Sequence, residues 1–585
     1  TDPTPKLSGT IKVYDRFEFL LYESSRAIGH QEIVSLNEVP RDLIDAVILT
    51  EDERYYKHFG VDLIAIFRAL WQNLKSGRIV SGASTIPQQL VRFTVISPHA
   101  PAKVSLVRKI RESLMAVRLS LTTSKNKVLE LYLNNMHFGR GVYGAQAASR
   151  LYFGKGVSSL SLAQSVLLAG MIANPNKYDP ISHPDESLAR RNDILEAMLE
   201  KGLGDEERFE RARDEPLPIK LTEIEIIAPH AVEMALSEIG KFGMTSEEGI
   251  SVYTTIDSGL YNLTRRTAVQ QVMRLKFEHD LTNAAVVILE NASGEVLSLL
   301  GSIDYFDDSI QGKNNMAIAA RQPGSSIKPV TYAAAFQKGI ATPATPIDDV
   351  PKVYLTKKGE GFLPHNYDGR YRGRVLIREA LASSYNLPAV EMLERVGIGE
   401  FLNLAQQMGI TTMQQTENYD LALTLGGGEV NLLELTNLYA TFARGGKWIP
   451  TQLVSKVVAD NGKVLFEATF SEPKTVLDEK VAWLITDILS DKKARIPTFG
   501  EKNALVLTKP AAVKTGTTTD WHDNWTIGYT SDYTIGVWVG NSDNHPMKQI
   551  SGVTGAAPIW NQIFEELLKF GAAGVGVLRG GKRAG

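Results

Sequence analysis

Four serines in this chain stand three residues before a lysine, at Ser124, Ser325, Ser471 and Ser490. A serine hydroxyl becomes a useful nucleophile only when a base lies beside it. Residues three apart share a face of a helix, so the lysine of such a pair can accept the proton. Because chance accounts for most pairs of this kind, other motifs must decide among the four.

The order of three motifs selects one serine. Acyl-transfer enzymes of the serine class carry Ser-x-x-Lys, then Ser-x-Asn, then Lys-Thr-Gly. Lys514-Thr515-Gly516 is the only Lys-Thr-Gly in the chain, and Ser325 with Lys328 precedes it by way of Ser384-Tyr385-Asn386, at intervals of 59 and 130 residues. The turn-like Pro323-Gly324 and the later Pro329 require a helix to begin close to Ser325. The sequence therefore predicts an exposed serine nucleophile at this helix start.

The other three pairs fit less well. Ser471 and Ser490 have no Ser-x-Asn between themselves and Lys514, and Ser542-Asp543-Asn544 follows Lys514. Ser124 satisfies the order if it is paired with Ser384, but it falls in a different predicted domain.

A second group of residues lies nearer the start of the chain. Glu51 and Asp52 form an acidic pair, and a glutamate at the edge of a cleft can act as a general base if its pKa is raised. Such pairs are more often solvated surface. From Arg92 to Lys127 there are eight Lys or Arg residues against the single acid Glu112, a local charge of +7. Because Phe93 is the only Phe, Tyr or Trp among them and no nucleic-acid motif accompanies them, a compact anion such as a pyrophosphate fits better than nucleic acid.

Composition limits the classes of protein that remain. With 63 basic and 66 acidic residues among 585, the net charge is −3, which gives no global basic bias for nucleic acid. Cysteine is absent, so disulfides, a thiol nucleophile and a Cys-based zinc site are excluded. The long uncharged stretch 157–176 contains several polar residues and Pro175, so it is predicted to be a buried core helix rather than a membrane span.

The elements that must position these residues fall into two groups. Apolar residues recur at helical spacing between about 42 and 203, and the helix 61–74 either packs into the core or lies at a membrane interface. Beyond it, strand-like runs at 250–257, 284–289, 296–300 and 532–540 surround helical patterns at 328–338, 377–407 and 431–443. Strands on both sides of a block of helices predict an α+β domain.

The predicted organisation therefore has five parts. Residues 1–40 form a short β-rich lead-in, 41–203 a mainly α domain, 204–275 a linker region, 276–570 an α+β domain, and 571–585 a disordered Gly-rich tail.

The stretches 321–329, 384–389 and 514–517 resemble the three boxes of the penicillin-binding transpeptidases. The stretches 51–60, 82–90, 108–112, 130–139 and 190–192 resemble the family-51 peptidoglycan glycosyltransferases, which have a mainly α, lysozyme-like fold. The whole chain is similar to the class A penicillin-binding proteins. This resemblance implies a multidomain protein in which the glycosyltransferase domain precedes an α+β transpeptidase domain related to the serine β-lactamases.

The resemblance also implies roles for individual residues. In the second domain Ser325 would attack the stem peptide, Lys328 would take its proton, Ser384 and Asn386 would relay protons, and Lys514 and Thr517 would hold the terminal carboxylate, with Thr515 and Gly516 beside them. In the first domain Glu51 would be the general base for joining lipid II to a glycan strand, with inversion to a β-1,4 bond. Glu112 would assist as the second carboxylate, Arg108 and Lys109 would hold the pyrophosphate, and the residues lining the cleft would be Asp52, Ser84, Thr85, Gln88 and Gln89.

Partners and location follow from the same resemblance. The expected partners are lipid II, glycan strands, stem peptides, β-lactams, moenomycin-like inhibitors, activator proteins and proteins of the divisome or elongasome, with no nucleic acid. Transpeptidation would need no cofactor, while Mg²⁺ or Mn²⁺ could assist glycosyl transfer. Because the chain begins at Thr1, a single N-terminal anchor in the bacterial cytoplasmic membrane is expected before it, with both sites outside that membrane. The alternative is a D,D-carboxypeptidase, a β-lactam-hydrolysing protein or a β-lactam sensor with an inactive glycosyltransferase-like domain.

Overall fold

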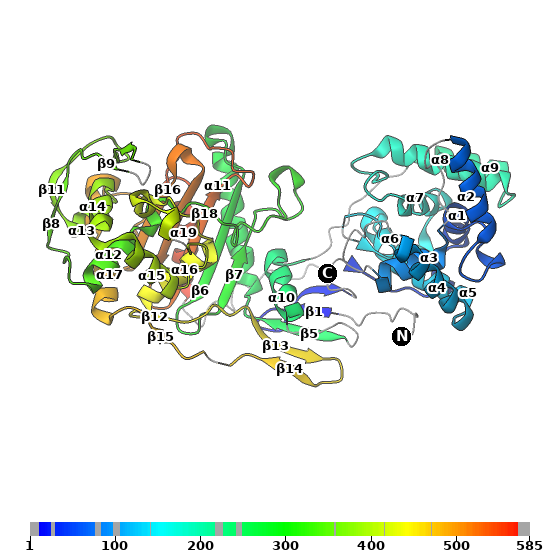
Figure 1. Ribbon diagram of the computed structural model, residues 1–585, viewed down its shortest axis with the longest axis horizontal. Helices are drawn as coiled ribbons and strands as arrows, with labels where there is room; N and C mark the ends of the chain where they lie inside the picture. The colour runs from blue at the N-terminus through cyan, green and yellow to red at the C-terminus, as the bar shows by residue number, and fades with distance from the viewer. Residues whose placement is uncertain are drawn as a thin grey trace.

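The computed structural model describes residues 11–24, 30–76, 84–96, 106–140, 142–216, 226–241, 249–355, 359–414, 416–469 and 471–570. Two bodies are joined by a sheet, as Figure 1 shows. The N-terminal body is mainly helical, and the C-terminal body combines a sheet with helices. The predicted order of a mainly α domain and then an α+β domain is confirmed.

The first domain is built around one fully enclosed helix. Every residue of α7 (Leu162–Ile172) except Ile172 is buried, which is what an apolar surface on all sides of a helix requires. This helix is the core of the stretch that the sequence predicted to be a buried helix. Helices α1 and α8 pack against α7. The helices of this domain are α1 (Arg41–Glu51), α2 (Leu63–Ser76), α3 (Ile86–Val91), α4 (Leu106–Thr122), α5 (Lys125–Asn135), α6 (Ala145–Phe153), α7, α8 (Pro184–Glu200) and α9 (Glu206–Asp214), with the short strands β3 (His30–Gln31) and β4 (Val142–Tyr143).

The sheet between the two bodies draws its strands from three distant parts of the chain. Its order is β14-β13-β5-β1-β2, in which β1 (Ile11–Tyr14) lies parallel to β5 (Ile250–Thr254). The remaining strands are β2 (Leu20–Ser24), β13 (Val454–Ala459) and β14 (Val464–Glu467), and α10 (Pro229–Lys241) lies close by in Figure 1.

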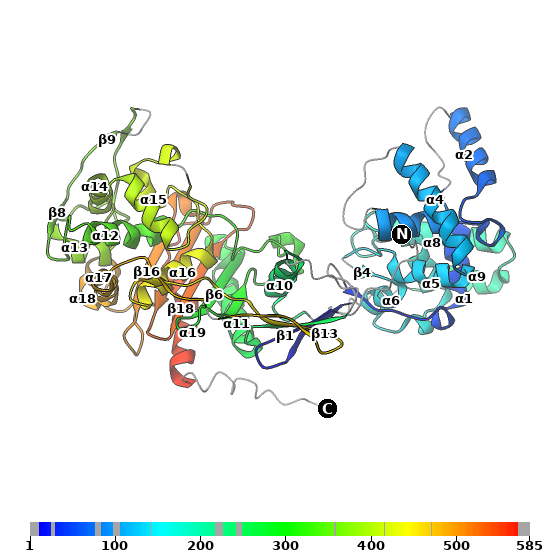
Figure 2. The ribbon, with the colours of Figure 1, turned by 60° about the horizontal axis from the view of Figure 1, so that its bottom comes forward.

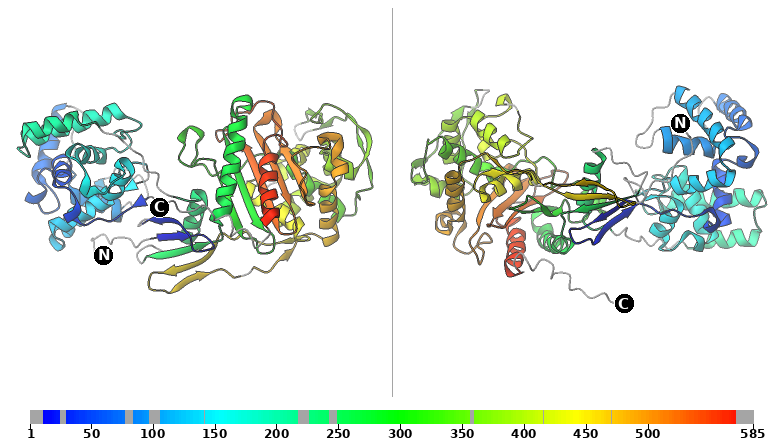
Figure 3. Two further views of the ribbon diagram at one scale, coloured as in Figure 1. Left: turned by 180° about the vertical axis from the view of Figure 1, so that it is seen from behind. Right: turned by 90° about the horizontal axis from the view of Figure 1, so that it is seen from below.

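The second domain has a five-stranded antiparallel sheet in the order β16-β17-β18-β6-β7. Its central strands are buried on both faces because helices cover each side. Helices α11 and α19 lie on one face, as Figure 3 shows from behind, and α16 packs on the other. The strands are β6 (Asn283–Glu290), β7 (Val296–Leu300), β16 (Ala512–Thr517), β17 (Asp523–Tyr529) and β18 (Tyr533–Gly540).

Helices and small hairpins complete this domain. The helices are α11 (Ser258–His279), α12 (Lys328–Gln337), α13 (Ile377–Ala382), α14 (Asn386–Val396), α15 (Ile398–Gln407), α16 (Leu432–Ala443), α17 (Glu479–Ser490), α18 (Lys492–Phe499) and α19 (Ala557–Phe570). The minor strand pairs are β8 (Pro346–Asp349) with β11 (Gly373–Leu376), β9 (Tyr354–Leu355) with β10 (Gly361–Phe362), and β12 (Lys447–Trp448) with β15 (Lys474–Thr475).

The structure differs from the predicted boundaries at the lead-in and the linker. Phe209 and Ala212 of α9 lie in the core of the first domain, so this domain continues beyond residue 203. Helix α11 lies in the core of the second domain, which therefore begins before residue 276. The lead-in strands β1 and β2 are part of the central sheet. Strands need partners for their backbone groups, and the pairing of β1 with a strand more than 200 residues away cannot be read from local spacing. The predicted disordered tail, 571–585, lies outside the described residues.

Among the described residues, no helix combines the length and the apolar character that crossing a bilayer requires.

Candidate active sites

The predicted nucleophile lies on a tight turn before a helix. Ser325 belongs to the 3-10 turn Gly324–Ile327, and α12 follows at once with Pro329 in its first turn. The carbonyl of Gln322 accepts a hydrogen bond from Trp525 Nε1 at 2.8 Å, and the carbonyl of Ser326 accepts one from Tyr439. The turn is thus held from both sides while Ser325 faces a cavity of about 490 Å³. The predicted start of the helix near Ser325 is confirmed.

Strand β16 approaches this turn very closely. A Cβ atom added to Gly516 would lie 2.2 Å from the carbonyl oxygen of Pro323, and one added to Gly324, whose φ is +54°, would lie 2.6 Å from the carbonyl oxygen of Thr517. Only glycine fits such backbone contacts. The glycine of the Lys-Thr-Gly motif therefore lets the strand lie against the nucleophile turn.

Lys328 is completely buried and held by three acceptors. Its Nζ donates to the carbonyl oxygens of Ser384 (2.7 Å) and Tyr385 (3.0 Å) and to Asn386 Oδ1 (2.6 Å). Burial, followed by repulsion from Lys514, holds the pKa of Lys328 well below its ordinary value. A lysine in this environment can act as a base near neutral pH.

Ser384 connects the two lysines. Lys514 Nζ donates to Ser384 Oγ at 2.7 Å, and the same oxygen lies 3.5 Å from Lys328 Nζ. Burial and then the charge of Arg495 lower the pKa of Lys514 to about 7. Ser384 has a φ of +64°, which is uncommon for a residue with a side chain and directs its hydroxyl between the two amines. The structure therefore brings together Ser325, Lys328, Ser384, Asn386 and Lys514, five residues from three separate stretches of the chain.

A buried polar network lies behind Lys328 and was not predicted from the sequence. Asp349 is fully buried and accepts two hydrogen bonds from Asn366 Nδ2, at 2.9 and 2.8 Å. Asn366 Oδ1 in turn accepts from the backbone N–H of Asn386 at 2.7 Å. The network fixes the start of α14, and hence the amide that binds Lys328. Neither Asp349 nor Asn366 lies in a recognisable motif, so no local signal marks them.

In the first domain, Glu51 ends helix α1 and points to a partner on α3. Gln89 Nε2 donates to Glu51 Oε2 at 2.8 Å, and Tyr132 OH donates to Gln89 Oε1 at 3.1 Å. Burial raises the pKa of Glu51, while the hydrogen bond from Gln89 and the charge of Arg190 oppose that rise. A half-buried carboxylate with a raised pKa is suited to general base catalysis.

A cluster of cations surrounds the second predicted carboxylate. Glu112 is completely buried, and its oxygens lie 3.4 Å from Arg92 Nε, 3.1 Å from Arg108 Nε and 3.3 Å from Lys109 Nζ. Lys109 Nζ also donates to Ser84 Oγ at 2.6 Å. One carboxylate among three cations leaves a local excess of two positive charges. Glu112 therefore holds these side chains together without neutralising them, which leaves them able to bind a dianion.

Comparison with known proteins assigns both domains. Residues 21–199 match the family described as transglycosylase, and residues 284–565 match the family described as penicillin binding protein transpeptidase domain. Penicillin-binding protein 1A of Aquifex aeolicus is 31% identical, over 96% of this chain and 84% of its own. Penicillin-binding protein 2D of Bacillus subtilis is 32% identical, over 92% of this chain and 77% of its own.

The chain belongs to the class A penicillin-binding proteins. It combines the transglycosylase and transpeptidase domains of a bifunctional peptidoglycan synthase. The crystal structure of penicillin-binding protein 1A from Haemophilus influenzae has the same overall fold, with a TM-score of 0.55 and 20% identity, over 96% of this chain and 92% of that chain.

Three residues of this class A penicillin-binding protein that were predicted to bind substrate have internal partners instead. Asp52 Oδ1 lies 2.9 Å from His58 Nε2, and Asp52 Oδ2 accepts from the backbone N–H of Ile86 at 3.0 Å. Thr85 and Gln88 form the capping box of α3, and they are 2% and 3% exposed. Short polar residues at the start of a helix commonly satisfy its free N–H groups, and the sequence could not separate that role from lining a cleft.

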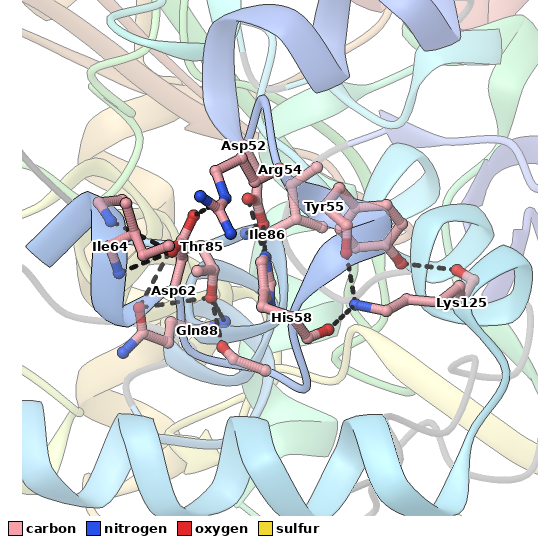
Figure 4. A network of polar contacts seen from close by, with 12 residues as sticks. Asp52, Arg54, Tyr55, His58, Asp62, Ile64, Thr85, Ile86, Gln88 and Lys125 are labelled. Atoms are coloured by element: carbon pink, nitrogen blue, oxygen red, sulfur yellow. Dashed lines mark hydrogen bonds and ion pairs between the residues drawn. The ribbon is translucent and has the colours of Figure 1, made fainter.

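Figure 4 shows the network of polar contacts around Asp52 and His58. His58 lies between Asp52 and the loop that Lys125 holds through two carbonyl oxygens, those of Tyr55 and His58, each at 2.6 Å. On the other side of the network, Asp62 accepts from the backbone N–H of Ile64 at 2.9 Å and so caps α2. Asp52 therefore positions Glu51, its neighbour in the chain, by fixing α3 beside it.

Two further residues influence Glu51 or its partner Gln89 and were not predicted as site residues. Tyr132 orients the amide of Gln89, and Arg190 acts electrostatically on Glu51. Both lie inside stretches that resemble family boxes, which is the only signal that could have identified them.

The described residues contain no group of three or more His, Asp or Glu side chains placed to hold a metal ion. The described side chains therefore do not by themselves make a metal site.

Proposed function

We propose that Ser325 and Glu51 are the two reacting residues of a synthase that both polymerises lipid II and cross-links stem peptides. The observation that supports this most directly is the chain of contacts Lys514–Ser384–Lys328 beside Ser325. It provides both a buried amine to take a proton and a hydroxyl to pass it on.

In the transpeptidase domain, Ser325 Oγ attacks the carbonyl of the penultimate D-Ala, and its proton passes to Lys328 Nζ. The C–N bond to the terminal D-Ala breaks, and the leaving amine gains a proton by way of Ser384. Lys514 and Thr517 hold the terminal carboxylate, and Thr515 lies beside them in the cavity wall. The N–H groups of Ser325 and of strand β16 stabilise the oxyanion.

In the transglycosylase domain, Glu51 takes the proton of the 4-hydroxyl on the GlcNAc of lipid II. The freed oxygen attacks the anomeric carbon of the growing strand, and undecaprenyl pyrophosphate leaves. Arg92, Arg108 and Lys109 face the leaving pyrophosphate, and Glu112 keeps them in place. We also propose that a divalent cation assists this glycosyl transfer. Mg²⁺ in such sites is held largely by the substrate's phosphate oxygens, and activity after chelation and readdition of Mg²⁺ or Mn²⁺ tests it.

We propose that the first domain meets a bilayer through α2 and α4. Leu63, Phe67 and Trp71 of α2 are 66%, 72% and 73% exposed, and Leu114 of α4 is 68% exposed. These exposures contradict the core packing that the sequence left open for α2. Figure 2 shows both helices rising from the same side of the domain. Exposed Trp and aliphatic side chains on a helix suit the interface of a membrane.

The proposed function also implies a cellular location and binding partners for this protein. We propose that both sites lie on the outer side of the cytoplasmic membrane, reached from an N-terminal anchor, because lipid II and stem peptides are used there. We propose that the cation cluster around Glu112 binds moenomycin-like inhibitors. We also propose that divisome or elongasome proteins activate this protein.

Hydrolysis is less well supported than cross-linking. Asp368 and Asp520 are the carboxylates that line the cavity of Ser325. The hydrogen bond from Arg372 lowers the pKa of Asp368 to about 2, which makes it a poor base for activating water. This argues against Asp368 as the deacylating base of a β-lactam-hydrolysing protein.

The proposal is tested with fluorescent lipid II, supplied with and without penicillin. Polymer in both reactions, with cross-links only when the drug is omitted, is the expected result. Cross-links that persist with penicillin, or polymer that fails to form in either reaction, would contradict it.

A further inference from the structure

A second cavity lies directly beside the cavity of the nucleophile. It has a volume of about 320 Å³, and Thr519 and Asp520 line both cavities. Arg321, four residues before Ser325, also lines it. The two spaces are therefore neighbours, and a group bound in the second is placed to reach an acyl group on Ser325.

Three carboxylates line this second cavity: Glu429, Asp520 and Asp523. In the described part of the chain, none of the three forms an ion pair with a Lys, Arg or His side chain. The two basic residues of the wall have other partners, since Arg321 bonds to Asn544 and the Ser542 carbonyl, and His522 Nδ1 lies 2.7 Å from the Asn544 carbonyl oxygen. Arg321 and His522 attract Asp523 without bonding to it, and the three carboxylates outnumber the single guanidinium of the wall, so the cavity carries an excess of negative charge.

The surroundings of Asp523 disfavour the negative charge on its carboxylate. Its side chain is nearly fully buried and its Oδ1 accepts from Trp538 Nε1 at 2.8 Å, while no hydrogen bond to Oδ2 occurs within the described residues. Burial raises the pKa of Asp523. A buried carboxylate with so few partners favours a ligand that brings hydrogen-bond donors or positive charge.

The turn that carries Asp520 is also unusual. Asp520 and Trp521 have φ values of +58° and +57°, in succession and without glycine. Two such residues cost folding energy, and this one turn sets Asp520 between the two cavities.

We propose that this cavity binds the positively charged amine of the acceptor stem peptide. The inference rests on the proposed transpeptidation, which needs an amine as its second substrate. An amine is a cation at neutral pH, and an anionic cavity next to the acyl-enzyme collects it in preference to water.

Aminolysis of the acyl-enzyme at this site has three steps. The bound ammonium first gives one proton to a carboxylate of the cavity or to solvent. The neutral nitrogen then attacks the ester carbonyl of the acyl-enzyme, forming the C–N bond and breaking the bond to Ser325 Oγ. The second proton of the amine passes to Oγ, which restores the serine.

The test compares the wild type with a double variant, Glu429→Gln with Asp520→Asn. The matched control is Asp532→Asn, an exposed aspartate in the turn at the opposite end of β17 and β18. The donor is diacetyl-Lys-D-Ala-D-Ala. One acceptor is Nα-acetyl-lysine amide, which is cationic, and the other is hydroxylamine, which is mainly neutral at pH 7. The readout is the ratio of aminolysis to hydrolysis, with the rate of penicillin acylation measured alongside.

In the double variant, the ratio for the lysine amide is expected to fall about tenfold, as the loss of one or two charge-assisted contacts implies. For the single variant Glu429→Gln, which lines only the second cavity, the ratio for hydroxylamine and the rate of acylation are expected to stay within about twofold, as in the Asp532 control. An unchanged ratio for the lysine amide would overturn the inference, and so would an equal fall for hydroxylamine. If the double variant is not acylated, the single variants are read by the same criteria. A wild type that forms no acyl-enzyme would instead contradict the proposed function.

Discussion

The hydrogen bond from Gln89 to Glu51 predicts a shift in the pH profile of glycan polymerisation. Burial raises the pKa of Glu51, and the N–H of Gln89, 2.8 Å from Oε2, opposes that rise by stabilising the charged form. The variant Gln89→Met keeps the length of the side chain but removes the donor. The pKa of Glu51 must therefore rise further, so the ionised base is lost at a higher pH.

The size of the shift follows from the bond that is removed. A hydrogen bond to a charged group contributes about 1.5–3 kcal/mol, and one pKa unit corresponds to about 1.36 kcal/mol, which gives roughly 1–2 units. Because Glu51 is only half-buried, water replaces part of the lost bond, and we expect about one unit. The acid limb of kcat/KM should move upward in pH by that amount. Tyr132→Phe, which frees the Gln89 amide to turn away, should move it in the same direction but less.

The assay measures polymerisation of fluorescent lipid II across the acidic and neutral range, with penicillin present to prevent cross-linking. The pH dependence of penicillin acylation is the internal control, since that site lies in the other domain. The reasoning is refuted if the acid limb of Gln89→Met stays in place or moves to lower pH while the protein remains folded.

The remaining predictions concern both sites, the nucleophile turn and the membrane face. Glu51→Gln should lower polymerisation by about 10²–10⁴, because the amide cannot accept the proton, and leave penicillin acylation unchanged; near-normal polymerisation would move the base elsewhere, first to Glu112. Ser325→Ala should show no adduct by intact-mass analysis after penicillin treatment, and an adduct that survives would refute the assignment. Gly516→Ala should slow acylation and cost about 1–3 kcal/mol of stability, because its Cβ would meet the Pro323 carbonyl, with polymerisation retained. The pair Phe67→Ser with Trp71→Ser should weaken liposome binding with little change in Tm, whereas a large fall in Tm would show that these side chains pack in a core.

The candidate sites could be predicted from the sequence to different degrees. The order of the Ser325, Ser384 and Lys514 motifs selected Ser325 as the predicted nucleophile because each motif is short and its residues act through fixed spacing. The role of Glu51 rested on the resemblance to the glycosyltransferase family, and the cation cluster around Glu112 was visible as a local excess of Lys and Arg. Both roles stay predictions. In contrast, Asp52, Thr85 and Gln88 were assigned to the substrate, and the structure shows them bound to backbone groups of the protein. A polar side chain in a stretch that resembles a family motif can bind either substrate or the protein's own backbone, and only its neighbours in space decide which.

The sequence by itself determined the local features of this protein: the helix start at Ser325, the enclosed helix α7 and the order of a helical domain before an α+β domain. These depend on hydrophobic periodicity, on turn residues and on the apolar content of short segments, all of which can be read over a few residues. The tertiary structure decided the rest. It joined β1, β5 and β13 in one sheet and placed Asp349 and Asn366 behind Lys328. It also lowered the pKa values of both lysines by burial, reinforced by the charge of Lys514 at Lys328 and by the charge of Arg495 at Lys514. Burial and repulsion between charges depend on distances in space, and residues nearly 200 positions apart in the chain carry no local signal of that distance.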